Sequence, residues 1–160
     1  MTHRYDISVV RHTRATPHTL FDVLADGSRW SDWARPLITY SRWETRGPDD
    51  DGGVGAIRIV GARRFPTREM ITVYEPGHRH GYTILANKPV QNYRATVTFT
   101  GEGDLTRIDW HGCFDSRLRV VGVTYRAVVG YVLRTLAAKL VAEAERRDRV
   151  RPDTQPHALP

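Results

Sequence analysis

The spacing of hydrophobic residues changes along the chain between the periods typical of strands and of helices. Residues 5–13 are rich in β-branched side chains and predict a first strand. Thr16 followed by Pro17 predicts a helix start, because a hydroxyl cap and a proline at the first position satisfy or remove free backbone N–H groups. A second short helix is predicted over residues 28–34.

A series of extended segments follows, and turn residues separate them. Signals such as Glu75-Pro76-Gly77 and Gly101-Glu102-Gly103 break the pattern at short intervals. Turns this short join antiparallel strands, since parallel strands need a long crossover. We expect six further strands, over residues 38–46, 54–62, 67–75, 79–86, 91–100 and 105–115.

The last two of these segments alternate clearly between apolar and polar residues. Tyr93 and Val97 share one face of the first segment, against Arg94 on the other. Trp110 and Phe114 share one face of the second. One face of the sheet is therefore expected to be buried and the other to contact water.

Residues 120–147 predict one long helix with a broad apolar stripe. The stripe consists of Tyr125, Val128, Val129, Val132, Leu133, Leu136, Leu140 and Ala144. The tail from residue 148 has three prolines and little to bury, so we expect it to be disordered. The expected class is therefore α+β, with a folded domain over 1–147 and a tail over 148–160.

Composition adds limits to this picture. The chain has 160 residues, 40% of them hydrophobic, which suits one globular domain. The net charge is +6, but arginines are scattered along the chain, which does not favour nucleic-acid binding. Cys113 is the single cysteine and cannot form an internal disulfide, which favours a reducing compartment. With no signal-like or membrane-length apolar run, we expect a soluble, cytoplasmic protein.

Five stretches occur in an order that is characteristic of one group of proteins. They are Ala15–Asp26 with Trp30–Trp33, Gly53–Arg58, Thr72–Gly77, Tyr93–Thr96 and Thr106–Phe114. Over residues 5–147 the chain resembles the START/Bet v 1-like (SRPBCC) superfamily, within it the polyketide cyclase/dehydrase-like group. The resemblance implies a helix-grip fold, in which a curved seven-stranded antiparallel sheet wraps around the long C-terminal helix. It also implies a cavity between sheet and helix for sterols, polyketides, lipids or other apolar molecules.

The candidate ligand-binding residues follow from this fold and from the apolar faces. Trp30 and Trp33 are three residues apart and face the same way, on the helix that closes one mouth of the cavity in the similar family. Tyr93 and Trp110 have polar tips that could orient a ligand. The expected set is Trp30, Trp33, Arg58, Tyr93, Val97, Trp110, Phe114, Val129 and Leu133. The alternative for each is an ordinary place in a filled core.

Arg58 is the candidate for a charge inside the cavity. There it could polarise a carbonyl group or pair with an acidic headgroup. Its neighbours Ile57 and Ile59 compete for the inner face of the same strand. That competition slightly favours a surface position for Arg58.

Other reactive residue types do not form a recognisable site. His111 and Cys113 are two apart on a strand, about 6.6 Å, which is beyond hydrogen-bond reach. We therefore assign no catalytic residue and read Cys113 as a small apolar side chain. His78 and His80 are too few for a zinc site without further ligands, so no metal or cofactor is expected.

Three functions remain open from the sequence. The first is a binding protein that acts as carrier or sensor of a hydrophobic small molecule. The second is a cyclase- or aromatase-like enzyme, in which the fold holds a flexible chain beside one or two acid–base groups. The third is an interaction module without a ligand, which an exposed apolar patch and a dry core would favour.

Overall fold

A computed structural model of the chain describes residues 1–48, 52–85 and 89–150. Along the chain it contains β1 (His3–Thr13), α1 (Pro17–Ala25), α2 (Trp30–Trp33), β2 (Tyr40–Thr45), β3 (Ile57–Ala62), β4 (Phe65–Glu75), β5 (Arg79–Ile84), β6 (Gln91–Glu102), β7 (Leu105–Ser116) and α3 (Arg119–Val150). Each predicted helix and strand is present in the predicted order, and the α+β class is confirmed. The predicted strand end at residue 86 lies outside the described residues.

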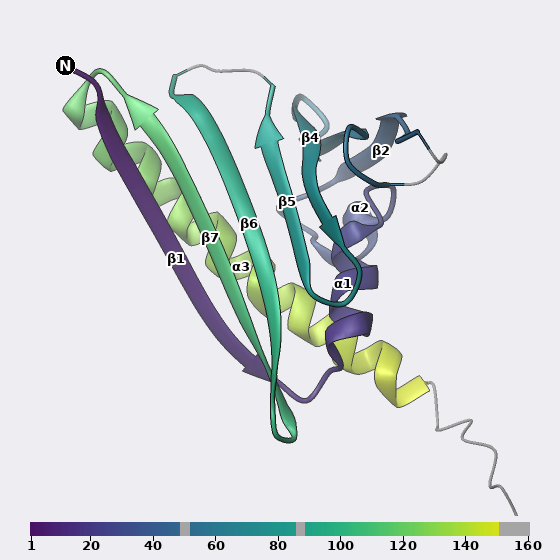
Figure 1. The fold of residues 1–160 in the computed structure, drawn as a ribbon. Helices are drawn as coiled ribbons and strands as arrows, with labels where there is room; N and C mark the ends of the chain where they lie inside the picture. Colours follow the sequence, from purple (N-terminus) through teal and green to yellow (C-terminus); the bar gives the residue numbers. More distant parts are fainter. Residues whose placement is uncertain (49–51, 86–88, 151–160) are drawn as a thin grey trace, which may run out of the picture.

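All seven strands form one antiparallel sheet in the order β1-β7-β6-β5-β4-β3-β2 (Figure 1). The N-terminal strand closes the order by pairing with the last strand, from His3 opposite Ser116 to Thr13 opposite Thr106. Register shifts in three strand pairs mark bulges or other irregularities of the pairing, and bulges bend a sheet. The sheet curves around α3, so the predicted helix-grip architecture is confirmed.

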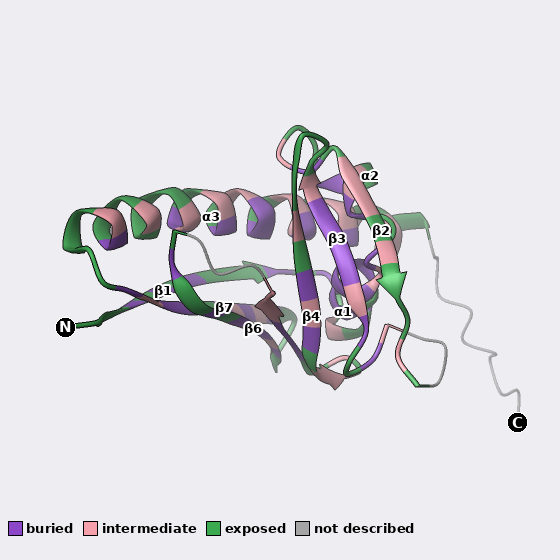
Figure 2. Cartoon of the chain, turned by 90° about the horizontal axis from the view of Figure 1, so that it is seen from above, coloured by how far each residue is buried: buried purple, intermediate pink, exposed green. Residues whose placement is uncertain are grey.

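The core lies between the inner face of the sheet and α3. Figure 2 shows α3 above the layer of β1, β7 and β6, while β4, β3 and β2 rise beside it. On β6 the buried residues Tyr93, Val97 and Phe99 alternate with exposed or half-buried ones, as predicted. The helix presents Leu133, Leu136, Ala137, Leu140 and Ala144 to the core.

Hydrogen bonds join the start of α1 to the C-terminal end of α3. The Thr16 hydroxyl caps α1 by accepting from the Thr19 amide, as predicted. Asp148 in α3 accepts hydrogen bonds from the Thr16 amide and the Thr19 hydroxyl. These contacts give the last turn of α3 tertiary support, and the helix continues to Val150. The prediction of a disordered tail from residue 148 was therefore wrong for 148–150, while 151–160 lie outside the described residues.

Among the described residues, no helix combines the length and the hydropathy that a membrane crossing requires.

Candidate ligand-binding site

A cavity of about 250 Å³ lies between the sheet and α3. Its apolar wall includes Ile38, Val60 and Ile84 from the sheet side and Val129, Val132, Leu133 and Leu136 from α3. Its polar wall consists of Thr67, Glu69, Tyr82, Tyr93 and Tyr125. Ligand pockets are typically about 300–1,000 Å³, mostly apolar, with a few polar groups. This cavity has that character, and its volume lies slightly below that range, so it suits a small ligand.

A buried ion pair forms one side of the cavity. Arg58 in β3 and Glu69 in β4 are direct cross-strand partners. The Arg58 Nε donates to Glu69 Oε2 at 2.9 Å, and Nη2 lies 2.8 Å from the same oxygen. Arg58 exposes none of its surface, whereas Glu69 is 8% exposed and lines the cavity. Glu69 therefore lines the cavity, whereas the fully buried guanidinium of Arg58 does not.

The surroundings of Arg58 explain how a charge is held in the core. Its guanidinium lies 4.0 Å from the ring centroid of Trp30 and 4.9 Å from that of Tyr82. Its Nη1 donates to the Leu24 carbonyl in the last turn of α1, at 3.3 Å. Two aromatic faces and the negative end of a helix both stabilise a cation. The sequence interpretation that favoured a surface position was wrong, because Arg58 has an ion-pair partner in Glu69.

Burial changes the acid–base properties of the cavity wall. It raises the pKa of Glu69 above its ordinary value, and the attraction of Arg58 opposes part of that rise. We place Glu69 in the ionised form at neutral pH, since a protonated carboxyl would leave the Arg58 charge buried without its partner. Burial also raises the pKa of Tyr82 and of Tyr93, so both phenols are neutral there.

The two tyrosines reach the cavity from neighbouring strands. Tyr82 lies on β5 and Tyr93 at the start of β6, with ring centroids 6.4 Å apart. Both are almost fully buried. Together with Glu69 they form a polar group in a wall that is otherwise mostly apolar. Such a group can accept and donate hydrogen bonds to one polar end of a ligand.

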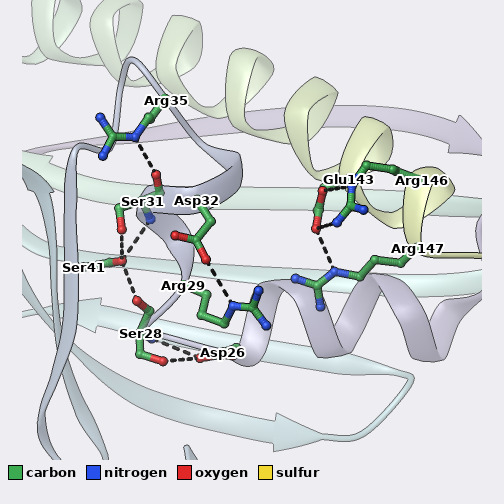
Figure 3. A network of polar contacts seen from close by, with 10 residues as sticks. All are labelled: Asp26, Ser28, Arg29, Ser31, Asp32, Arg35, Ser41, Glu143, Arg146 and Arg147. Carbon is green, nitrogen blue, oxygen red and sulfur yellow. Dashed lines mark hydrogen bonds and ion pairs between the residues drawn. The ribbon is translucent and has the colours of Figure 1, made fainter. Parts of the chain in front are cut away.

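A surface network of hydrogen bonds holds α2 in place (Figure 3), and α2 carries Trp30. The Ser41 hydroxyl in β2 donates to the Ser28 carbonyl and accepts from the Ser31 amide, each at 2.9 Å. Arg35 donates to the Ser31 carbonyl at 3.0 Å. The Trp30 indole N–H then donates to the same Leu24 carbonyl that Arg58 contacts. The short helix is thus held against β2, with Trp30 under the guanidinium.

The structure divides the nine predicted site residues into two groups. Trp30, Tyr93, Val129 and Leu133 lie in the cavity wall. The other five, Trp33, Arg58, Val97, Trp110 and Phe114, are buried but are not part of that wall. Contact of any of the nine with a ligand remains a prediction.

Sequence reasoning missed Glu69 and Tyr82. A usable signal for Glu69 was present, because a two-residue turn after Ala62 would place Arg58 opposite it. The predicted start of this strand at residue 67, instead of Phe65, hid that register. Tyr82 lies two residues after His80 on the buried face of β5, and this spacing was the one sequence feature that indicated an inward side chain.

The histidines and the cysteine considered in the sequence analysis do not form a common site among the described residues. His80 is fully buried among the rings of Phe21, Tyr74 and Tyr82, and burial lowers its pKa well below the ordinary value. His78 is exposed. No group of three or more His, Cys, Asp or Glu side chains within the described ranges is placed to hold a metal ion. Cys113 is a buried free thiol.

Comparisons with known proteins agree with this architecture. The sequence matches the model of one protein family over residues 4–145, and that family is described as polyketide cyclase / dehydrase and lipid transport. No curated protein matches the sequence.

Several solved structures share the fold at low sequence identity. A START superfamily protein from Mycobacterium smegmatis superposes with a TM-score of 0.71 at 16% identity, over 89% of this chain and 98% of that one. A protein from Nitrosospira multiformis gives 0.72 at 20% identity, over 91% and 99%. A point mutant of Thalictrum flavum norcoclaurine synthase, in complex with a transition-state analogue, gives 0.73 at 16% identity, over 92% and 98%.

Proposed function

Because the chain belongs to the polyketide cyclase/dehydrase and lipid transport family, we propose that it binds one small hydrophobic molecule between the sheet and α3. The observation that carries this proposal is the cavity of about 250 Å³ with a mostly apolar wall. A concave, mostly apolar surface with a few polar groups is the usual form of a small-molecule site, and this supports an occupant here. A role as carrier or sensor in the cytoplasm, where the free thiol of Cys113 is stable, is part of the proposal.

Native mass spectrometry of the freshly purified protein tests this function, with any bound compound identified after denaturation. Val129→Trp places a large ring in the cavity wall, whereas Val123→Trp makes the same change at an exposed position of the same helix. We expect the wild type and Val123→Trp to carry the bound mass and Val129→Trp to lose it. Circular dichroism checks that both variants fold. Equal retention by both variants would exclude the cavity as the site.

A cyclase- or aromatase-like activity is the second candidate, and Glu69 is the observation that favours it. A carboxylate with a raised pKa, beside the Tyr82 and Tyr93 phenols, is a suitable general base for a carbon acid next to a carbonyl. Arg58 acts only through Glu69 in this scheme, since it does not line the cavity. Incubation with a poly-β-ketone thioester and chromatography of the products would test it. Turnover that survives Glu69→Gln in folded protein would argue against this role.

An interaction module is the third candidate, favoured by the outer face of α3. Val120, Val123 and Tyr131 are each more than half exposed there. This alternative predicts a filled core, whereas a cavity lies between the sheet and α3. We therefore rank the interaction module below ligand binding. Concentration-dependent association in light scattering would raise it.

A further inference from the structure

The ion pair beside the cavity restricts which ligands the site can accept. Arg58 already has a counter-ion, and both of its contacts with Glu69 end on one oxygen, Oε2. No hydrogen bond joins the second oxygen, Oε1, to Arg58, and Glu69 keeps part of its surface exposed at the cavity wall. A ligand therefore meets a hydrogen-bond acceptor and not the guanidinium.

From this geometry we propose that the ligand ends in a neutral hydroxyl group, as an alcohol, phenol or enol does, which donates a hydrogen bond to Glu69 Oε1. The inference rests on the proposed function, since it names the ligand class for the same cavity. Tyr82 and Tyr93 line the same wall as Glu69 and supply further hydroxyl groups there, as do Thr67 and Tyr125. A hydroxyl group suits this environment because it both donates and accepts hydrogen bonds.

A carboxylate ligand does not fit the same site. Its negative charge would lie against Glu69, and Arg58 is completely buried behind that residue. An ammonium ligand does not fit either, because Arg58 already balances the Glu69 charge and the cation would be buried in excess. An uncompensated charge in a desolvated site is costly. The pair thus selects for neutral ligands, although each partner alone would attract an ion.

Isothermal titration calorimetry with one apolar body and three polar ends tests this selectivity. The probes are 2-naphthol, naphthalene and 2-naphthoate at pH 7, where the first is neutral and the last is ionised. We expect 2-naphthol to bind at least about tenfold more tightly than naphthalene, a difference of about 1.4 kcal/mol, and 2-naphthoate to bind more weakly than both.

A double variant separates hydrogen bonding from structural support. Arg58→Met with Glu69→Leu replaces both charges by apolar groups, a change that buried pairs often tolerate. We expect this variant to bind naphthalene at least as well as the wild type and to lose the preference for 2-naphthol. Circular dichroism establishes that it is folded.

The outcomes distinguish this inference from the proposed function. Tight binding of 2-naphthoate, or a preference for 2-naphthol that survives in the folded double variant, would overturn the hydroxyl inference while ligand binding stands. Failure of the wild type to bind any of the three probes would count against the proposed function itself.

Discussion

Removal of one partner of the Arg58–Glu69 pair should destabilise the protein far more than removal of both. Arg58→Met leaves the Glu69 carboxylate beside the cavity without its counter-ion, and a broken buried pair costs about 3–5 kcal/mol. The change also removes the guanidinium from the faces of Trp30 and Tyr82, contacts worth about 2 kcal/mol when desolvated. Together these two losses give an expected decrease of about 5–7 kcal/mol in the free energy of unfolding.

The double variant Arg58→Met/Glu69→Leu should recover most of this loss. Apolar replacement of both partners removes the desolvation cost together with the attraction, so we expect a stability within about 2 kcal/mol of the wild type. Urea unfolding followed by circular dichroism measures both variants, and the two single variants complete a double-mutant cycle. A cost below about 1 kcal/mol for Arg58→Met, or additive effects in the cycle, would refute the account of the pair.

The pH dependence of Arg58→Met gives an independent check. Without the cation, burial acts on Glu69 unopposed and raises its folded-state pKa further than in the wild type. The pKa in the unfolded chain does not change. A raised folded pKa contributes stability at low pH that is lost as pH rises through that value. The cost of Arg58→Met should therefore be larger at pH 8 than at pH 5. A cost that does not change with pH would mean that Glu69 is in contact with solvent.

Two further predictions concern the packing of the core. Burial lowers the folded-state pKa of His80, so the unfolded chain takes up a proton first as the pH falls. Stability should therefore fall below about pH 6.5, by at most about 1.4 kcal/mol per pH unit. His80→Leu should remove this slope in urea unfolding, and an unchanged slope would contradict the assignment. Gly122→Ala should cost about 1–3 kcal/mol despite the better helix propensity of alanine, because the added Cβ would overlap the Tyr5 ring. A rise in Tm on thermal unfolding would contradict this expectation.

Much of the fold followed from periodicity. The alternation on β6 and the stripe on α3 are direct consequences of one buried face on each, so the side of the sheet that meets the helix could be predicted. That is also why Tyr93, Val129 and Leu133 were placed correctly on inward faces. The extent of α3 was less predictable, because its last turn depends on the contacts of Asp148 with α1, which join residues 129 and 132 positions apart.

The polar part of the candidate site was harder to predict, because it depends on pairing between strands. Arg58 looked exposed beside Ile57 and Ile59, and only the register with β4 shows that Glu69 neutralises it. The contact of Arg58 with Trp30 needs the position of α2 as well. Single-strand patterns describe which residues share a face, but not which buried charge finds a partner across the sheet.

A neutral apolar ligand is expected to occupy the space between the sheet and α3. Methyl ¹H–¹³C NMR spectra during a titration with 2-naphthol test it most directly, because ring currents shift nearby methyl signals. We predict saturable shifts for the cavity-lining residues Val129, Val132 and Leu133, and none for Val120 and Val123 on the outer face of the same helix. Shifts confined to Val120 and Val123, with the cavity methyls unchanged, would contradict the claim.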